Sequence, residues 1–254
     1  MTPDAIRILM FDWGGTIVRV ARQHLVPDRC VDAALAVLRD SGRACPPEAE
    51  AALRLRLHQH FSGADAKPGL REFDTSATLA HWAGHHGIPL PDASFLRTVV
   101  DALWQPWIGS LDLLDRADTT LRRLVSRGYT LGLVSNCAAP PHICRQELNR
   151  LGIDELFAFH VFSSEVGHCK PHERIYARAL SAARVHAPDL RPHEVLFIGD
   201  TPVPDVDGPA GHGLQTALVR TGRWDGSPGG LNHQPDLVLD SISCLPAALG
   251  LDAS

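Results

Sequence analysis

Lysine is scarce in this chain of 254 residues, and the chain has neither a long apolar run nor an excess of basic charge. No apolar run approaches the ~20 residues that a membrane-spanning helix needs, so we expect no membrane partner. The formal net charge of −5 argues against a nucleic-acid partner, because that binding needs a basic surface. Lysine occurs only at positions 67 and 170 among 24 basic residues, which makes each lysine a candidate for a specific role.

Cysteine pairs of the usual metal or redox kinds are also missing. None of the six cysteines lies in a CxxC pair or at a Cys/His spacing typical of zinc sites. A chain of this length buries roughly three-quarters of its unfolded surface and does not depend on disulfides. The residues before Asp12 show neither a basic lead nor a small-residue cleavage site, so we expect no signal peptide. Free thiols and a cytoplasmic location follow as expectations.

Short apolar runs recur along most of the chain, and helical patterns lie between them. The expected strands are residues 6–11, 129–134, 159–162, 195–198, 214–219 and 237–239. The expected helices between them are residues 119–126, 141–151 and 173–183. This alternation is typical of a doubly wound α/β fold, in which helices cover both faces of a parallel sheet. In such folds the functional site lies beyond the carboxyl ends of the strands.

Residues 19–109 show a different pattern, with no clear strand and with helical segments separated by Pro and Gly clusters. The expected helices here are residues 25–40, 47–61, 75–86 and 93–104. We therefore expect a core built from residues 1–18 and 110–254, with residues 19–109 inserted as an α-helical cap domain.

Four motifs follow strands of the expected core in a fixed order. Asp12 ends the first strand ahead of Gly-Gly-Thr, and Ser135 ends the second strand. Lys170 precedes a proline and a helix, and Asp200 and Asp205 follow a later strand in the segment GDTPVPD. This order resembles that of the haloacid dehalogenase (HAD) superfamily, whose first motif is DxDxT. The resemblance covers the core up to about residue 219, and implies a Rossmannoid core with a helical C1-type cap.

The resemblance implies a Mg²⁺-dependent hydrolase that acts on a small phosphorylated metabolite through an aspartyl-phosphate on Asp12. Lys170 would join Asp12 as a catalytic residue, because a cation offsets the charge of the phosphate and of the carboxylate. Hard oxygen ligands suit Mg²⁺, and the implied set is Asp12, the carbonyl of Gly14, Asp200 and Asp205. The implied phosphate-binding groups are the backbone of Trp13 and Gly14, and the side chains of Ser135, Asn136 and Lys170.

The first motif departs from the pattern of the phosphatases in this superfamily. They carry an Asp two residues after the nucleophile, as a general acid and base, and here that position is Gly14. General acid–base help contributes roughly 10²–10⁴ in rate. We therefore expect slow hydrolysis of alkyl phosphates and a smaller deficit for acyl or enol phosphates, whose leaving groups need no proton.

Two alternatives remain open. The run Asp-Trp-Gly-Gly-Thr is similar to the first motif of phosphonoacetaldehyde hydrolases, which cleave a P–C bond in a phosphonate metabolite with a cap lysine, here Lys67. The second alternative is a catalytically weak phosphate-binding or regulatory protein. His24 is the first candidate for a substitute proton donor. His81 and His85, spaced i, i+4 on an expected helix, are expected to be surface or packing residues rather than a metal pair. Trp82, Trp104 and Trp107 are expected to belong to the core of the cap rather than to a wall that faces the substrate.

Overall fold

The computed structural model describes residues 5–20, 26–62, 68–220 and 231–251. Its centre is a six-stranded sheet in the order β5-β4-β1-β6-β7-β8, and all neighbouring strands are parallel. The strands are β1 (Ile8–Phe11), β4 (Thr130–Ser135), β5 (Phe159–Phe162), β6 (Val195–Gly199), β7 (Gln215–Val219) and β8 (Leu237–Leu239). The doubly wound α/β fold is therefore confirmed, and the six core strands lie within two residues of their expected bounds.

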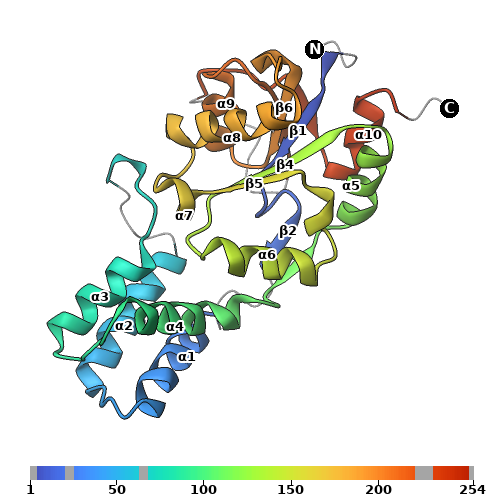
Figure 1. The fold of residues 1–254 in the computed structure, drawn as a ribbon. Helices are drawn as coiled ribbons and strands as arrows, with labels where there is room; N and C mark the ends of the chain where they lie inside the picture. The colour runs from blue at the N-terminus through green and yellow to red at the C-terminus, as the bar shows by residue number, and fades with distance from the viewer. Residues whose placement is uncertain (1–4, 21–25, 63–67, 221–230, 252–254) are drawn as a thin grey trace.

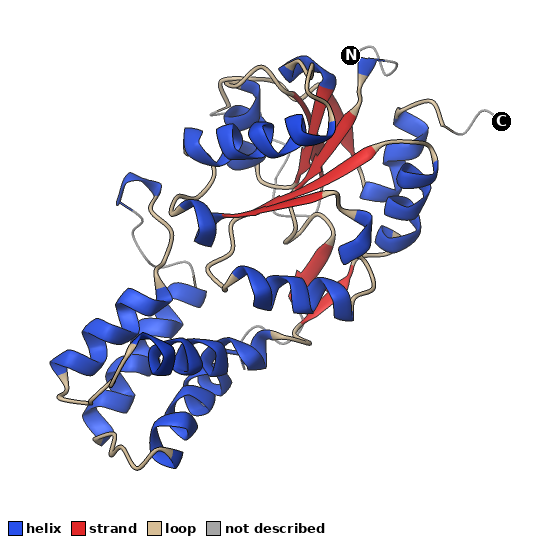
Figure 2. Ribbon diagram, in the orientation of Figure 1, coloured by secondary structure: helices blue, strands red, loops and turns tan. Residues whose placement is uncertain are grey.

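Helices cover both faces of this sheet because its strands are apolar on both sides (Figures 1 and 2). Ile8 and Met10 of β1 pack with the apolar side chains of α8, whereas Leu9 and Phe11 belong to the core on the opposite face. The helices of this part are α5 (Ala117–Ser126), α6 (Pro141–Arg150), α7 (Ser163–Val166), α8 (Glu173–His186), α9 (Gly208–Ala210) and α10 (Leu245–Ala248), and a π-helical turn spans Val203–Asp207.

Four longer helices form a bundle beside the sheet, drawn in colours from blue to green in Figure 1. They are α1 (Val26–Asp40), α2 (Pro47–Phe61), α3 (Thr75–His85) and α4 (Ala93–Trp104). Local chemistry sets where α3 and α4 begin, because Asp74 and Asp92 accept hydrogen bonds from the free backbone N–H groups of Ala77 and Phe95. Helix α1 packs against both α2 and α4. Trp82, Trp104 and Trp107 are buried in this bundle and beside it, as expected.

A two-stranded antiparallel ribbon joins the bundle to the sheet. It pairs β2 (Val18–Val20) with β3 (Leu111–Leu113). The expectation that residues 19–109 contain no strand was therefore wrong, since β2 extends to Val20. Each strand has only three residues, and its partner lies far away in the sequence, so no local pattern indicated it. The division of the chain at residues 18/19 and 109/110 stays a prediction.

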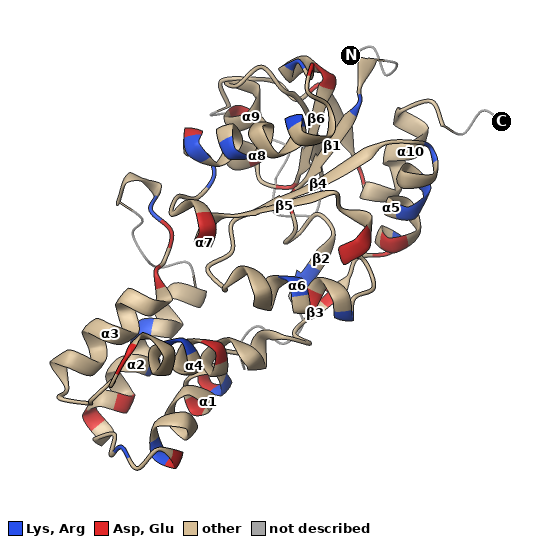
Figure 3. Ribbon diagram, in the orientation of Figure 1, with Lys and Arg blue, Asp and Glu red and all other residues tan. Residues whose placement is uncertain are grey.

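The surface of the described chain carries charges of both signs, which are interspersed along the outer helices (Figure 3). Among the described residues, none of the helices combines the length and the apolar character needed to cross a membrane.

Candidate active site at the carboxyl edge of the sheet

Three of the sequence-predicted residues meet at the carboxyl edge of the sheet because their strands are neighbours. β1 lies between β4 and β6, with Phe11 opposite Leu133 on one side and Ile198 on the other. Asp12 continues this pairing, since its N–H donates to the carbonyl of Ile198 at 2.8 Å. Asp12, Ser135 and Asp200 therefore emerge side by side from three adjacent strands.

An acidic cluster forms there from Asp12, Asp200 and Asp205. All three residues are buried, and one carboxylate oxygen of each lies within 4.8 Å of the others. The turn after β6 holds Asp205 in place. The N–H of Thr201 donates to Asp205 Oδ2, and the N–H of Asp205 donates to the carbonyl of Thr201, both at 2.9 Å. The Thr201 hydroxyl also donates to Asp200 Oδ1 at 3.3 Å.

Lys170 contacts this acidic cluster, and among the described residues it is the only lysine that does so. Its Nζ donates to Asp12 Oδ1 and to Asp205 Oδ1, each at 2.7 Å. Burial acts to lower the pKa of Lys170, but the two carboxylates outweigh this effect and raise the pKa. Burial also raises the pKa of Asp205, against the opposing effect of Lys170. Lys170 thus remains charged and links Asp12 to Asp205.

Two glycines make room for these carboxylates. A Cβ on Gly15 would lie 2.2 Å from Asp200 Oδ2, and a Cβ on Gly199 would lie 2.3 Å from Asp205 Cγ. Gly15 also has a φ of 85°, a left-handed conformation that favours glycine. Gly14 differs from both, because a Cβ there would have no atom within 4 Å and its φ is not positive. Of the two glycines, Gly15 is therefore the one whose backbone conformation favours glycine.

Asn136 holds the backbone of Lys170 from both sides. Its Oδ1 accepts the N–H of Lys170 at 2.6 Å, and its Nδ2 donates to the carbonyl of Lys170 at 3.2 Å. Sequence reasoning assigned this amide to phosphate, and that contact stays a prediction. In the structure, the amide fixes the position of Lys170. Ser135, at the end of β4, is buried at the same edge of the sheet.

Trp13 anchors the loop that follows Asp12. Its ring is buried and packs edge-on against Trp107, with ring centroids 5.4 Å apart, and against Phe162. Its carbonyl accepts the N–H groups of Ile17 and Val18. These contacts close the loop around Gly14 and Gly15, while the predicted contact of its backbone N–H with phosphate stays a prediction.

Sequence reasoning missed Glu72, which reaches the core from the segment between α2 and α3. Glu72 Oε2 accepts hydrogen bonds from the hydroxyl of Ser163 and, at 3.0 Å, from the thiol of Cys169. The backbone N–H of Glu72 donates to the carbonyl of Gly167 at 3.1 Å. The segment before α3 is thus attached directly beside Lys170. No sequence pattern links position 72 to positions 163 and 169, so only the fold reveals this contact.

Asp207 is a further carboxylate close to Asp205 in the sequence. It accepts the N–H groups of Asn232 and His233, and so fixes that later segment rather than joining the cluster. His24 and Lys67 lie outside the described residues.

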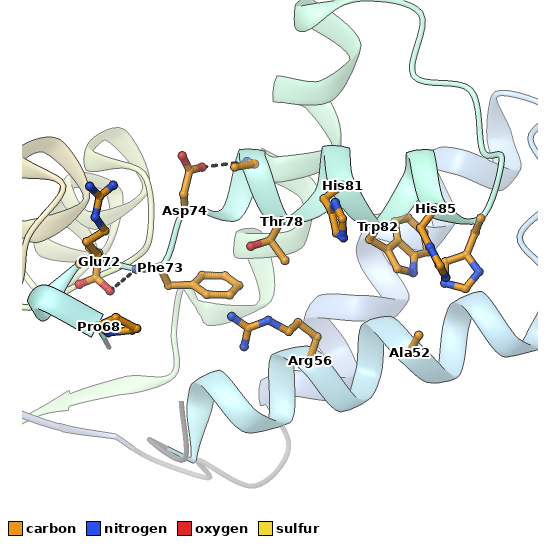
Figure 4. A pocket seen from close by; sticks show the side chains of 13 residues that line it. Ala52, Arg56, Pro68, Glu72, Phe73, Asp74, Thr78, His81, Trp82 and His85 are labelled. Carbon is orange, nitrogen blue, oxygen red and sulfur yellow. Dashed lines mark hydrogen bonds between the residues drawn. The ribbon is translucent and has the colours of Figure 1, made fainter. Parts of the chain in front are cut away.

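A pocket of about 600 Å³ is lined by residues of α2, of α3 and of the segment 68–74 that precedes α3 (Figure 4). Arg56 of α2 and His81 and His85 of α3 line it, and the Arg56 guanidinium lies 4.8 Å from the centre of the Phe73 ring. None of the motif residues of the core lines this pocket. The two histidines therefore face a cavity, and among the described residues they do not form part of a metal-binding cluster.

Comparison with known proteins relates the chain to a single superfamily. Residues 6–213 match the family model of the haloacid dehalogenase-like hydrolases. A glyceraldehyde 3-phosphate phosphatase of Methanopyrus kandleri is 32% identical over 122 residues, which are 48% of this chain and 49% of that protein. The chain thus matches about half the length of such curated relatives.

Solved structures show the same fold over nearly the whole chain. A HAD phosphatase from Thermococcus onnurineus superposes with a TM-score of 0.62 at 18% identity, covering 98% of this chain and 100% of that one. A 2-haloacid dehalogenase from Pseudomonas syringae pv. Tomato superposes with a TM-score of 0.64 at 20% identity, covering 96% and 98% of the two chains. Because the two neighbours differ in named activity, the shared fold does not select a reaction.

Proposed function

The chain belongs to the haloacid dehalogenase-like hydrolases, and from that premise we propose that it is a Mg²⁺-dependent phosphate-ester hydrolase that acts on a small phosphorylated metabolite through Asp12. One observation carries this proposal. Lys170 Nζ lies 2.7 Å from both Asp12 and Asp205, beside the third buried carboxylate of Asp200. A candidate nucleophile, a cation and carboxylate oxygens that could bind a metal thus lie close together, which supports the proposal.

The residues present fit a Mg²⁺ ion. Three buried carboxylates face one ammonium group, so these four groups carry a net charge of −2 when all are ionised. A buried excess of negative charge is costly without a compensating cation. Asp12, Asp200 and Asp205 offer oxygens close together, and Mg²⁺ prefers oxygen ligands. A bound Mg²⁺ would neutralise the phosphate and the cluster, so that one anion can approach another.

Asp12, Lys170 and Ser135 have separate roles in the proposed reaction. A carboxylate oxygen of Asp12 attacks phosphorus, the bond from phosphorus to the leaving oxygen breaks, and an aspartyl-phosphate forms. Water then hydrolyses this intermediate and restores Asp12. Lys170 orients Asp12 through its hydrogen bond and supplies positive charge where the phosphate oxygens gain negative charge. Ser135, buried at the neighbouring strand end, would donate its hydroxyl to a phosphate oxygen.

The missing carboxylate at position 14 sets the expected substrate preference. An alkoxide leaves poorly without a proton, whereas the carboxylate of an acyl phosphate leaves well without one. The site therefore favours phosphates whose leaving groups are already acidic. The half-length match to a glyceraldehyde 3-phosphate phosphatase supports a small phosphorylated metabolite as the substrate class.

A turnover screen tests the proposal directly. Acyl, aryl and alkyl phosphates and a phosphonate are each assayed with Mg²⁺ and with EDTA, for the wild type and Asp12→Asn. We expect Mg²⁺-dependent release of phosphate, lost in Asp12→Asn and retained in Asp240→Asn, which makes the same change at an exposed carboxylate. Equal turnover in Asp12→Asn, or in EDTA, would overturn the proposal.

The same screen separates the two alternatives. Cleavage of the phosphonate, with trapping of an imine by borohydride, would favour P–C bond cleavage. Mg²⁺-dependent binding of phosphate esters without repeated turnover would favour a phosphate-binding or regulatory role.

A further inference from the structure

Two cysteines outside the acidic cluster lie in direct contact. The Sγ atoms of Cys137 and Cys144 are 3.4 Å apart. Cys137 lies in the loop between β4 and α6, directly after Ser135 and Asn136, and Cys144 lies in the first turns of α6. The contact therefore joins the loop of the candidate site to a helix of the core.

The two thiols differ in their access to solvent. Cys137 is half-buried, whereas Cys144 is fully buried against the core. Burial raises the pKa of Cys144 well above its usual value, which keeps it a protonated thiol. An oxidant from solution would thus meet Cys137 first, and Cys144 would be the partner that resolves the oxidised sulfur.

We propose that Cys137 and Cys144 are an oxidisable pair, and that their disulfide releases Lys170 from Asn136. Peroxide oxidises the Cys137 thiol to a sulfenic acid and is reduced to water. The sulfur of Cys144 then attacks the Cys137 sulfur, the S–S bond forms, the S–O bond breaks, and the hydroxyl leaves with the thiol proton as a second water. Two thiols together lose two electrons and two protons.

Closing the bond requires the two sulfur atoms to approach one another. A disulfide has an S–S length of about 2 Å, so the sulfurs must approach by over ~1 Å. Cys144 is fully buried in α6, whereas Cys137 is half-buried in a loop that packs against the same core, so we expect the larger displacement at Cys137. The N–H of Cys137 donates to Ser163 Oγ at 2.8 Å, and its carbonyl accepts from the N–H of Ser164 at 3.2 Å and from the hydroxyl of Ser163 at 3.3 Å.

Movement at Cys137 reaches Lys170 through one residue. Asn136 precedes Cys137, and its Oδ1 accepts the N–H of Lys170 at 2.6 Å. A shift of about 1 Å takes this contact beyond hydrogen-bond distance. Lys170 would then lose the backbone hydrogen bond to Asn136 that helps to hold it beside Asp12 and Asp205. An effect on turnover rests on the proposed function, whereas the disulfide and the loss of the hydrogen bond between Asn136 and Lys170 do not.

Peptide mapping tests the bond itself. Trypsin is expected to release residues 128–145 as one peptide with both cysteines and no other. After mild peroxide treatment we expect this peptide to be lighter by two hydrogens and resistant to alkylation, with both changes reversed by dithiothreitol. Cys137→Ser should abolish the change, and Cys45→Ser, at another half-buried cysteine, should not. Accumulation of sulfinic acid at Cys137 with a free Cys144 would overturn the proposal.

Hydrogen exchange tests the coupling without any substrate. The Lys170 amide should exchange faster in the oxidised protein, and Asn136→Ala should produce the same rise in the reduced protein as a positive control. An oxidised pair with an equally protected Lys170 amide would overturn the release of Lys170. If both tests succeed and oxidation reversibly lowers turnover, the switch acts on the proposed activity. If both succeed in a protein that shows no turnover, the proposed function fails and the switch stands.

Discussion

The carboxylate of Asp200 lies so close to Gly15 that a Cβ atom on Gly15 would be 2.2 Å from its Oδ2. The backbone of Gly15 also adopts a left-handed conformation, while its neighbour Gly14 has neither restriction. The two consecutive glycines of the first motif therefore serve different purposes. Gly15 makes room for a metal-ligand candidate, and Gly14 leaves an open position where phosphatases of this superfamily carry an acid.

Alanine at each glycine separates these purposes. Gly15→Ala should destabilise the protein by at least ~1–2 kcal/mol, because of its left-handed backbone, and should also displace Asp200. Gly14→Ala is the matched control and should leave the melting temperature nearly unchanged. Thermal unfolding of both variants and calorimetric titration with Mg²⁺ measure the difference. Equal melting temperatures and equal Mg²⁺ affinities in the two variants would contradict the predicted role of Gly15.

Asp200 itself can be tested for metal binding. Asp200→Asn keeps the size of the side chain but removes a charged ligand oxygen, so we expect Mg²⁺ affinity to fall by roughly 10–100-fold or more. Asp207→Asn makes the same change two residues beyond Asp205, at a carboxylate that binds backbone N–H groups instead. Calorimetry should show nearly wild-type affinity in Asp207→Asn. Unchanged affinity in Asp200→Asn would remove Asp200 from the metal site.

Lys170→Met should lower the free energy of unfolding, because it leaves buried carboxylates without their cation. Removing one partner of a buried ion pair typically costs about 3–5 kcal/mol, and here Asp12 and Asp205 both lose their ammonium partner. We expect a large fall in unfolding free energy in EDTA. Mg²⁺ should then raise the melting temperature of Lys170→Met more than that of the wild type, because the ion meets uncompensated negative charge. Equal Mg²⁺-induced shifts would argue against a metal site shared with Lys170.

The amino-acid pattern was sufficient to predict the sheet, because its strands are apolar on both faces and end at punctuating residues. β5 and β8 match their expected bounds, and β1 begins two residues later than expected. The order of the motifs also predicted that Asp12, Asp200 and Asp205 lie together, as they do. These features depend on local pattern and on the rule that parallel strands share a carboxyl edge.

Contacts between distant segments could not be predicted in this way. The pairing of β2 with β3 joins residues over ninety positions apart, and the sequences VRV and LDL carry no register signal of their own. The contact of Glu72 with Ser163 and the contact of Cys137 with Cys144 likewise depend on how the packed elements meet. The different roles of Gly14 and Gly15 required backbone angles, which a Gly-Gly pair does not reveal.

A buried histidine predicts how stability depends on pH. His160 lies in β5 between Phe157 and Phe162, and burial lowers its pKa below 6.5, although Asp154 opposes this shift. The unfolded chain therefore takes up a proton near pH 6.5 while the folded protein does not, so stability falls as the pH decreases below that value. His160→Phe should therefore reduce the fall in stability below pH 6.5, because it removes the group that takes up this proton. Denaturant unfolding of both proteins between about pH 8 and pH 5.5 measures this difference. Equal changes in unfolding free energy with pH in the two proteins would contradict the prediction.

The leaving group of the substrate provides the sharpest test of Gly14. With no carboxylate at this position, wild-type rates should fall steeply from acyl to aryl to alkyl phosphates. The structure also shows that a side chain fits, since a Cβ on Gly14 would meet no atom within 4 Å. A new carboxylate at this position can therefore be tested without the backbone strain that the neighbouring Gly15 would impose.

Gly14→Asp should raise alkyl phosphate turnover the most, by up to the ~10²–10⁴ typical of general acid–base catalysis, because the new carboxylic acid can protonate the departing alkoxide. Acyl phosphates should gain less in this step, since their leaving group needs no proton. Gly14→Asn is the matched control, with the same size and no transferable proton, and its leaving-group dependence should stay as steep as that of the wild type. Steady-state rates over the three substrate classes give the slopes. A flat wild-type profile, with no gain in a folded Gly14→Asp protein, would show that another residue already supplies the proton.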